Sequence, residues 1–522
     1  MFIFENQCSF LRRAPVTEPV SELYDLAVIG GGINGVGIAA DAAGRGLSVF
    51  LCERDDLASH TSSASSKLIH GGLRYLEHYE FRLVREALAE REVLLAKAPH
   101  IVKPMRFVLP HRPHLRPAWM IRAGLFLYDN LGKREKLPAS RGLRFGDDSP
   151  LKPIIKHGFE YSDCWVDDAR LVVLNAMAAR EKGAHIHTRT QCLSAKRAGG
   201  IWHVELQRQD GSRFSLRAKA LVNAAGPWVA QFIGENLQQR SPYGIRLIQG
   251  SHIIVPKLYE GEQAYIMQNE DRRIVFAIPY LDRYTMIGTT DREYHGDPAT
   301  VSISEEEIAY VLGVANTHFR KQLEPKDIIH TFAGVRPLCD DESDNPSAVT
   351  RDYTLSLSAE EKQAPLLSVF GGKLTTYRKL AESAMAQLKP FFPAMGQSWT
   401  AKEPLPGGEG MNTAQALTEE LISKIKGVNR PLAKRWATLY GNRVWQMLGD
   451  ARSVEALGED LGQQLYAQEV EYLRREEWAS EVDDIIWRRT KLGLAFSDAE
   501  KDRLQSYLQA QPVVQLRPSS AA

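Results

Sequence analysis

The sequence is poor in cysteine and has no pattern of residues that would bind a metal ion. Its 522 residues include five cysteines, which are Cys8, Cys52, Cys164, Cys192 and Cys339, and they form no CxxC pair and no cluster with histidine. This spacing argues against a structural zinc site, an iron–sulfur cluster or a redox-active dithiol. We therefore expect no metal cofactor, and we interpret the cysteines as packing residues of a protein from a reducing compartment.

A long apolar run and an excess of charge are also missing. No segment has 18 uninterrupted apolar residues, so no transmembrane helix is predicted. Residues 1–22 carry Glu5 within their apolar start and lack a small-residue cleavage site, and we interpret them as an N-terminal extension rather than a signal peptide. The net charge of +1 gives no reason to expect nucleic acid as a partner.

A nucleotide-binding motif begins at Tyr24. An apolar run at 26–29 predicts a buried strand and leads into a GxGxxG turn at 30–35. A helix pattern and a second apolar run follow, and this run ends at Glu53, 23 residues after Gly30. Because strand, turn, helix, strand and acid all occur at the expected spacing, the motif predicts dinucleotide binding rather than a structural glycine turn.

Each position of the motif has a physical role. Gly30 permits the tight turn, Gly32 lets a pyrophosphate approach the backbone, and Gly35 lets helix and strand pack closely. Asn34 lies in the same turn, at the positive end of the helix. Glu53 would accept hydrogen bonds from the ribose hydroxyls. This spacing leaves NAD and FAD both open.

Hydroxyl and glycine residues are concentrated in the segment 61–77, directly after the second strand. So many donors beside a nucleotide fold indicate a loop that wraps a phosphate or a ring, although a polar surface loop has a similar composition. The candidate cofactor-binding residues in this segment are Ser65, Ser66, Lys67, His70, Gly71 and Gly72.

Residues 103–136 combine cations with apolar and aromatic side chains. Eight Lys or Arg residues stand against Asp129 and Glu135, and Trp119, Ile121 and Phe126 lie among them. This composition suits docking at an anionic membrane surface. A core helix with a solvated basic rim is the alternative.

The remaining pattern predicts helices over 81–97, 168–182 and 304–320, an antiparallel sheet over 244–291 and a helical domain over 412–510. Short alternating runs at 185–188, 202–206, 214–216 and 220–222 predict the strands of a small meander. A Pro- and Gly-rich segment at 404–408 reads as a linker before that domain. We expect the antiparallel sheet to form a second, substrate-side layer.

Three further turns place small or cationic residues beside predicted strands. In NAAGPW, Ala225 and Gly226 would let the backbone approach a cofactor, and the turn FAGVRPL contains Gly334. The turn VFGGKLTTY joins a strand to a helix, whose N-terminus favours negative charge. Its candidate cofactor-binding residues are Gly371, Gly372, Leu374 and Thr375.

These motifs together resemble the aerobic FAD-dependent glycerol-3-phosphate dehydrogenase family, bacterial type. The resemblance runs from Tyr24 to about Gln509 and covers GGGINGVGIAADAAGRGLSV, SSASSKLIHGGLRYLE, FEYSDCWVDDARL, NAAGPW, GIRLIQGSHIIVP, IGTTD, GVRPLCDDE and VFGGKLTTYRKLAE. It favours FAD over NAD. It also implies a mixed α/β and α+β fold, in which a Rossmann-like FAD domain of the glutathione-reductase and D-amino-acid-oxidase type carries an antiparallel-sheet cap and a C-terminal helical domain.

The domain limits that follow from this resemblance are discontinuous. The FAD-binding domain would comprise 23–98, 160–235 and 330–390, and the cap 99–159 and 236–329, with the docking stretch 103–136 inside it. A linker at 391–411 would precede the helical domain at 412–522. Mitochondrial members of the wider family carry C-terminal EF-hands, but residues 400–522 contain no DxDxDG-type loop, so calcium control is not expected.

The resemblance implies oxidation of sn-glycerol 3-phosphate to dihydroxyacetone phosphate, by hydride transfer to flavin N5, with electrons passed to membrane quinone. It also implies a peripheral protein on the cytoplasmic face of the inner membrane and a homodimer. Two alternatives stay open at this point. One is a glycerol-3-phosphate oxidase that uses O₂, and the other is a non-catalytic membrane-associated flavoprotein.

The reaction requires a base and a cationic site for the phosphate. His252 resembles the family's candidate base, and Arg336, Lys373 and Arg74 are the candidates for the phosphate. Tyr75 would hydrogen-bond the substrate or pack against its neighbours. For the cations the alternative is a structural ion pair, and for His252 it is a hydrogen-bonded strand residue. The turn at 371–375 would stabilise negative charge on the reduced flavin.

Overall fold

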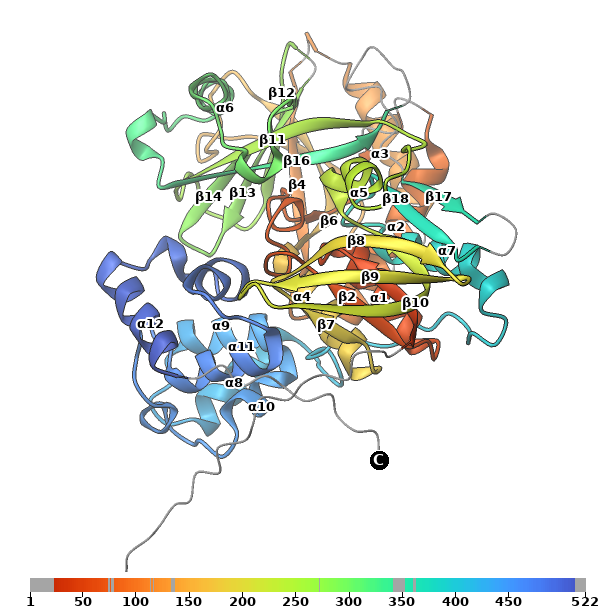
Figure 1. Ribbon diagram of the computed structural model, residues 1–522. Helices are drawn as coiled ribbons and strands as arrows, with labels where there is room; N and C mark the ends of the chain where they lie inside the picture. The colour runs from red at the N-terminus through yellow and green to blue at the C-terminus, as the bar shows by residue number, and fades with distance from the viewer. Residues whose placement is uncertain are drawn as a thin grey trace, which may run out of the picture.

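The chain folds into two sheet layers and a helical domain (Figure 1). The computed structural model describes residues 23–73, 76, 79–112, 114–115, 117–132, 137–271, 273–340, 353–359 and 363–511. The first sheet contains the nucleotide-binding motif, the second sheet lies above it in Figure 1, and the C-terminal helices lie below and to the left. The three parts expected from the sequence are therefore confirmed.

The first sheet has eight strands, six of them in the order β17-β18-β10-β1-β2-β7, while β9 pairs with β10 and β8 pairs with β9. Its strands are β1 (Leu23–Ile29), β2 (Val49–Cys52), β7 (His185–His187), β8 (Thr190–Ala198), β9 (Ile201–Arg208), β10 (Arg213–Asn223), β17 (Thr354–Ser358) and β18 (Leu366–Phe370). β1 pairs in parallel with β2 and β10. Its core is closed by α1 (Ile33–Gly44), α4 (Asp168–Glu181) and α7 (Tyr377–Leu388).

The meander predicted over 185–222 is present, with two differences. Residues 213–223 form one continuous strand, β10, where two short strands were expected. β8 was not predicted, because a register shift between Cys192 and Ser194 interrupts the alternation that reveals a strand.

The second sheet has ten strands, eight of them in the order β15-β11-β14-β13-β12-β4-β6-β3, while β16 pairs with β11 and β5 with β6. Its strands are β3 (Leu68–Ile69), β4 (Val102–Pro110), β5 (Arg141–Arg144), β6 (His157–Val166), β11 (Ile245–Pro256), β12 (Ala264–Gln268), β13 (Ile274–Tyr280), β14 (Tyr284–Gly288), β15 (Arg292–Glu293) and β16 (His330–Cys339). The pairing is antiparallel except between β12 and β4, so the predicted antiparallel layer is confirmed.

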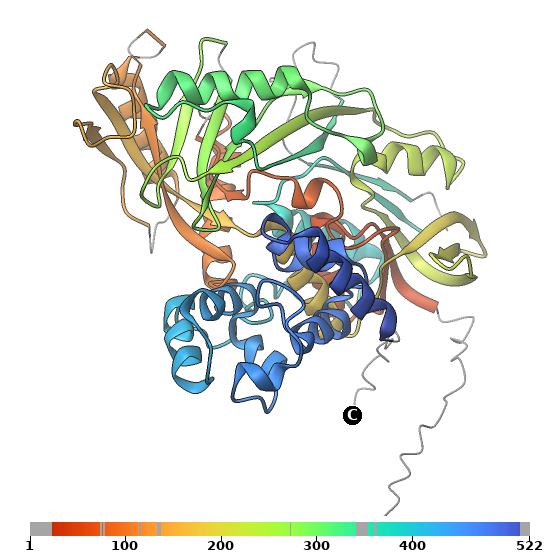
Figure 2. The same cartoon turned by 90° about the vertical axis from the view of Figure 1, so that its left-hand side faces the viewer.

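Helices cover both faces of the second sheet. α6 (Glu305–His318) packs on the outer face with β11 to β14, and it crosses the top of Figure 2. α2 (Phe81–Lys97) and α3 (Ala118–Leu131) pack on the opposite face, beside β4 and β6. The helices predicted at 81–97 and 304–320 are thus present, and the basic stretch at 103–136 contains both a strand and a helix.

The domain limits remain a prediction, and two of them fall on strand residues of the second sheet. β6 crosses residue 160, where one limit was placed, and it pairs with β4 of the second sheet. β16 begins at the predicted limit 330 and pairs with β11, also in the second sheet.

The C-terminal region is helical and has its own apolar core, as predicted. Its helices are α8 (Ala414–Lys424), α9 (Arg430–Tyr440), α10 (Val444–Leu448), α11 (Ala467–Glu477), the π-helical turn η9 (Asp484–Arg489) and α12 (Asp498–Ala510). The segment that precedes it packs on the first layer, where the Trp399 indole donates to the carbonyl of Asp41 at 3.2 Å. Within the described residues, none of the helices combines the length and apolarity that crossing a bilayer requires.

Candidate functional site

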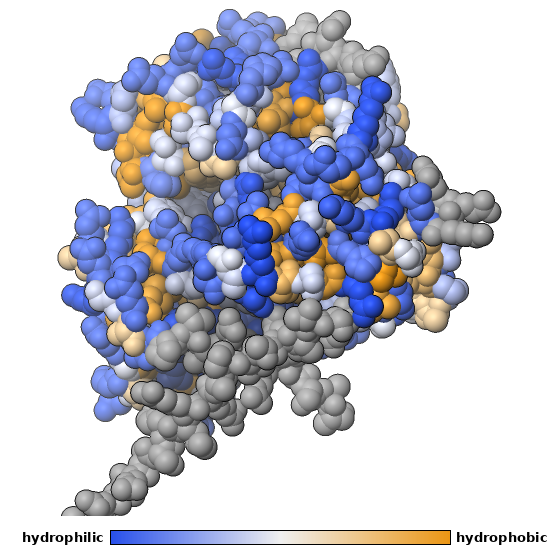
Figure 3. Space-filling view, in the orientation of Figure 1, coloured by the Kyte–Doolittle hydropathy of each residue, from blue (hydrophilic) through white to orange (hydrophobic). Residues whose placement is uncertain are grey.

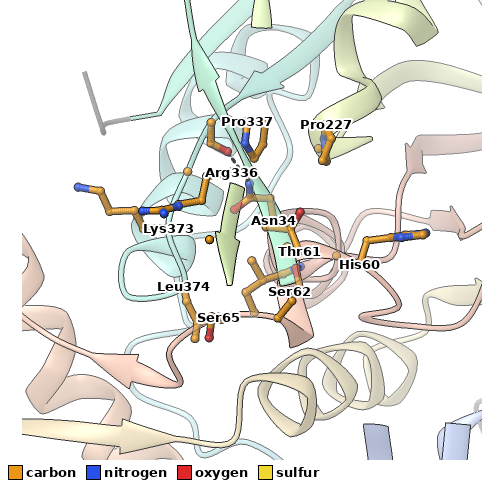
Figure 4. Close-up of a pocket in the computed structure, with 18 of the residues that line it drawn as sticks. Asn34, His60, Thr61, Ser62, Ser65, Pro227, Arg336, Pro337, Lys373 and Leu374 are labelled. Carbon is orange, nitrogen blue, oxygen red and sulfur yellow. Dashed lines mark hydrogen bonds between the residues drawn. The ribbon is translucent and has the colours of Figure 1, made fainter. Parts of the chain in front are cut away.

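A cleft of about 570 Å³ runs from the turn after β1 to the inner face of the second sheet. Figure 4 shows Arg336 and Lys373 on one side of the cleft and His60 and Pro227 on the other, with Asn34 between them. The lining therefore comes from both sheets and from the loop 59–66. Such a cleft can hold a long cofactor along the first sheet and a small substrate against the second.

The turn after β1 requires glycine at two positions. Gly30 has φ +112°, and a Cβ there would lie 2.4 Å from the carbonyl oxygen of Ala224. A Cβ on Gly35 would lie 1.9 Å from the carbonyl oxygen of Gly30, so this glycine shapes the turn and does not itself line the cleft. The Asn34 amide donates to the carbonyl of Gly371 at 3.1 Å, while its Oδ1 is buried without a partner among the described residues.

Glu53 lies at the end of β2, where the motif placed it. Its Oε2 accepts from the Gly31 N–H at 2.6 Å and its Oε1 from the Asp55 N–H at 2.9 Å. Burial raises the pKa of this carboxyl above its ordinary value, and the two backbone hydrogen bonds lower it in part. A contact between Glu53 and a ribose stays a prediction.

Several residues at this end were not predicted. The Arg54 guanidinium lies 4.0 Å from the centre of the Trp228 ring, and the ring centres of His60 and Trp228 are 4.8 Å apart. The Ser62 hydroxyl accepts from the Ile33 N–H at 3.0 Å, at the N-terminus of α1. The NAAGPW motif was the available signal for Trp228 and the hydroxyl-rich segment 61–77 was the signal for Ser62, but no pattern in the sequence indicated Arg54 or His60.

Asp168 holds the loop 65–67 in place. Its Oδ2 accepts from the Ser65 hydroxyl at 2.7 Å and its Oδ1 from the Lys67 ammonium at 2.6 Å, and the carboxylate is fully buried. Lys67 therefore stabilises the loop from behind and is not among the residues that line the cleft. Lys67 also lines a second cavity of about 300 Å³, between the second sheet and the C-terminal helices, where the surface in Figure 3 is hollowed.

His252 reaches the cleft from β11. Its Nε2 lies 2.9 Å from the Ser66 hydroxyl, its ring stacks on Phe332 at 4.7 Å, and its Nδ1 is buried with no hydrogen-bond partner in the part of the chain that the structure describes. Burial, followed by the positive charges of Lys67 and Arg336, lowers the pKa of His252 to about 3. The imidazole is therefore neutral at physiological pH and able to accept a proton.

Arg336 reaches the same end of the cleft from β16. Its Nη2 lies 2.9 Å from Asp291 Oδ1 and donates to the carbonyl of Thr290 at 3.0 Å. About a third of the side chain is exposed. A guanidinium that is oriented by a carboxylate and still lines an open cleft is suited to an anionic ligand.

The turn between β18 and α7 completes this end. Gly371 and Gly372 have φ +78° and +100°, conformations that glycine adopts without strain. Lys373 lines the cleft, and the Thr375 hydroxyl accepts from the His70 N–H at 3.4 Å. The turn leads directly into α7, so the positive end of that helix faces the cleft.

The structure brings most of the predicted residues together. The cleft is lined by Gly30, Gly32, Asn34, Glu53, Ser65, Ser66, His70, Gly72, Ala225, Gly226, His252, Gly334, Arg336, Gly371, Gly372, Lys373, Leu374 and Thr375. Gly71 packs behind it, donating its N–H to the Tyr128 hydroxyl at 2.8 Å. Arg74 and Tyr75 lie outside the described residues.

A glycine turn against a helix N-terminus, an acid at the end of β2 and a cleft closed by a second sheet define a dinucleotide-dependent oxidoreductase. The chain belongs to the FAD dependent oxidoreductase family, whose model matches residues 25–378, and FAD is its cofactor. The cleft fits FAD, because Gly32 presents its backbone to the cleft without a side chain and because, within the described residues, the buried Asn34 Oδ1 has no donor and could accept from a hydroxyl or N–H group of the cofactor. Residues 398–510 match the C-terminal domain of alpha-glycerophosphate oxidase.

Relatives of known name extend over almost the whole chain. A glycerol-3-phosphate dehydrogenase of Pseudomonas aeruginosa is 74% identical, covering 94% of this chain and 96% of its own length. The aerobic glycerol-3-phosphate dehydrogenase of Escherichia coli is 59% identical (93% and 97%), and a D-erythritol 1-phosphate dehydrogenase of Brucella abortus is 52% identical (92% and 96%). The glycerol-3-phosphate dehydrogenase from Bacillus halodurans, solved with FAD, superposes with a TM-score of 0.70 at 26% identity, covering 95% of this chain and 97% of its own.

Proposed function

We propose that this protein oxidises sn-glycerol 3-phosphate to dihydroxyacetone phosphate and passes the electrons to a membrane quinone. The observation that carries the proposal is the near full-length identity of 74% and 59% to proteins named glycerol-3-phosphate dehydrogenase. The cleft supports it with a neutral imidazole and two cationic side chains at one end, His252, Arg336 and Lys373.

FAD, when bound, supplies the acceptor for the hydride that leaves C2 of the substrate. His252 accepts the proton of the C2 hydroxyl, because it is neutral and hydrogen-bonded in place by Ser66. The substrate phosphate, at the same end of the cleft, offsets the positive field of Arg336 and makes the imidazole more basic. Arg336, oriented by Asp291, and Lys373 bind this phosphate, and Arg74 and Tyr75 remain proposed as further substrate contacts.

An anaerobic titration tests the proposal. Adding glycerol 3-phosphate to the oxidised holoenzyme should bleach the visible flavin band, and glycerol alone should leave it unchanged because it lacks the phosphate that Arg336 and Lys373 bind. A flavin that stays oxidised with glycerol 3-phosphate would contradict the proposed substrate. D-Erythritol 1-phosphate is the matched competitor, since a relative at 52% identity carries that name.

The electron acceptor is tested separately. An oxidase would reoxidise its reduced flavin in air and release one peroxide per substrate, whereas the proposed dehydrogenase should turn over with a soluble quinone and yield little peroxide. The match of residues 398–510 to an oxidase domain makes this measurement necessary. A peroxide yield equal to the substrate consumed would replace the quinone with O₂.

We also propose that α3 docks the protein peripherally on an anionic membrane. Its outward side carries Trp119 and Phe126, which are 71% and 69% exposed, together with the exposed Met120 and Leu127 and the cation Arg122. An apolar helix face with a neighbouring cation is suited to insertion among lipid headgroups. Attachment to the cytoplasmic side and a homodimer remain predictions.

Vesicle sedimentation tests this docking. Replacing Trp119 and Phe126 together with serine should release the protein from vesicles that contain anionic lipid, since two exposed aromatic anchors are removed. Replacing the exposed Ile154, which lies outside the basic stretch, with serine is the control. Equal binding by the wild type and the double variant would contradict the role of α3.

A further inference from the structure

Glu307 is a buried carboxylate on the face of the second sheet that points away from the cleft. It lies in the first turn of α6 and is 5% exposed. Its Oε2 accepts from the Ser304 N–H at 2.9 Å and forms the capping box of the helix. A capping box uses one carboxylate oxygen, so Oε1 is left for other partners.

Oε1 binds the sheet instead of the helix. It accepts from the Ser251 hydroxyl at 2.9 Å and from the Thr290 hydroxyl at 2.6 Å, and both of these residues are buried. Gln249 adds a hydrogen bond to Oε2 at 2.9 Å. One carboxylate therefore connects α6 to β11 and to the segment after β14.

Strand alternation connects this network to the cleft. Successive side chains of a strand point to opposite faces, so Gln249 and Ser251 face α6 while Gly250 and His252 line the cleft. Ser251 is the residue immediately before His252. Fixing the Ser251 side chain thus fixes the part of β11 that carries the imidazole.

Thr290 connects the same carboxylate to Arg336. Its hydroxyl donates to Glu307 and accepts from the Ser251 N–H at 2.9 Å, so its orientation is determined. Its carbonyl accepts from Arg336 Nη2 at 3.0 Å, and the next residue, Asp291, forms the ion pair with that guanidinium.

We propose that Glu307 is a positioning residue, which fixes the positions of His252 and Arg336 relative to each other in the cleft without touching substrate or cofactor. The inference rests on the proposed oxidation of glycerol 3-phosphate, in which these two side chains serve the same bound molecule. Catalysis is sensitive to such placement, since a displacement of about 1 Å can cost about 100-fold in rate. A capping residue alone would have no influence on the cleft.

The test compares Glu307→Gln with two variants of the same helix turn. Ser304→Ala removes the cap hydroxyl and its hydrogen bond to Oε2 but keeps the hydrogen bonds of Ser251 and Thr290 to Oε1. Glu306→Gln changes an exposed carboxylate that pairs with Arg292 at the surface. For Glu307→Gln we expect wild-type FAD content and a kcat/KM for glycerol 3-phosphate that is lower by about 10- to 100-fold. The two comparison variants should stay within about twofold, although Ser304→Ala lowers the Tm.

Anaerobic stopped-flow kinetics then distinguish a displacement of the two cleft side chains from a loss of protein stability. In Glu307→Gln the limiting rate of flavin reduction should fall and the Kd for substrate should rise, because both His252 and Arg336 are displaced. Equal kinetics in Glu307→Gln and Ser304→Ala would overturn the proposal. Wild-type protein that fails to reduce its flavin would instead contradict the proposed function.

Should Glu307→Gln fail to fold, Ser251→Ala decides the question. It removes one hydroxyl donor to Oε1 and leaves the capping box intact. A several-fold loss of kcat/KM with unchanged FAD content supports the positioning role, and wild-type kinetics would overturn it.

Discussion

His252 illustrates how a single buried side chain sets both reactivity and pH dependence. Among the described residues no carboxylate pairs with the imidazole, and burial with two nearby cations lowers its pKa to about 3. Its native-state pKa thus lies below the value of about 6.5 of an unfolded histidine. The imidazole is therefore a neutral base at neutral pH, and its low pKa reduces the free energy of unfolding at acidic pH.

Replacing His252 with glutamine should make the fold less sensitive to acid. Between about pH 6.5 and 3 the unfolded chain binds a proton that the native protein does not, so this histidine lowers the free energy of unfolding as the pH falls through that range. At pH 5 the difference is about 2 kcal/mol, and above pH 7 it vanishes. Denaturant unfolding at pH 5 and 7.5 measures it.

His100, which is buried away from the cleft and also has a pKa lowered to about 3, provides the comparison for His252. His100→Gln should relieve acid sensitivity in the same way but leave flavin reduction intact, whereas His252→Gln should slow flavin reduction by about 100-fold or more. Parallel pH dependence in all three proteins would contradict the buried neutral imidazoles.

Arg336→Ala should raise the KM for glycerol 3-phosphate by about 100-fold, because a guanidinium makes two charge-assisted hydrogen bonds to a phosphate. FAD content should not change. Arg246→Ala is the control, since Arg246 pairs with Glu293 on the same sheet but is not among the residues that line the cleft. An unchanged KM would remove Arg336 from the phosphate site.

At the scale of elements, the β1–turn–α1 unit depends on backbone shape more than on side chains. Gly30 is constrained twice, by its positive φ and by the carbonyl of Ala224. Gly46, just after α1, also has a positive φ of +87°, but a Cβ there would have no atom of the described residues within 4 Å. A side chain at Gly46 would only strain the backbone, whereas a side chain at Gly30 would also collide with the carbonyl of Ala224.

Gly30→Ala should abolish FAD binding, because the added methyl group displaces either the turn or β10. Gly46→Ala should retain FAD and lose about 1–2 kcal/mol of stability, which is the cost of a side chain in the left-handed region. Flavin absorbance per protein after purification measures the first effect and thermal unfolding the second. Full flavin content in Gly30→Ala would refute the assigned role of the turn.

At the scale of the whole molecule, the C-terminal helices hold the nucleotide end of the cleft. Arg489 in η9 is fully buried and binds Asp56 through two hydrogen bonds of 2.7 and 2.8 Å. Asp56 lies three residues after Glu53, in the turn that borders the cleft. Lys491 pairs with Asp167 at 2.9 Å, beside the Asp168 that holds the loop 65–67.

Arg489→Met should lower the free energy of unfolding by about 1–3 kcal/mol, because the buried Asp56 loses its two charge-assisted hydrogen bonds from Arg489 and keeps the one from Arg488. It should also speed the release of FAD, since the turn after β2 loses its support. Arg435→Met breaks a comparable pair with Glu469 inside the helical domain and should leave FAD release unchanged. Equal FAD release rates in the two variants would show that the helices do not support the cleft.

Local chemistry made much of this architecture predictable from sequence. The GxGxxG turn, the helices over 81–97 and 168–182 and the antiparallel layer each depend on residues that are neighbours in the chain, and each is present. β8 escaped prediction because a register shift interrupts its pattern, and β10 was divided in two. Asp168 and Glu307 could not be assigned, since their partners are distant along the chain.

The sequence by itself determined the nucleotide-binding motif, the order of the layers and, through resemblance, the cofactor FAD. The motif and the order of the layers follow from periodicity and glycine placement, which act over a few residues, whereas the choice of FAD rests on the resemblance. Only the tertiary structure decided that Lys67 pairs with Asp168 behind the loop, that Gly71 packs under Tyr128, and that His252 is held neutral. The physical reason is that burial, and with it the charge state and partner of a side chain, is set by segments that meet only when the chain has folded.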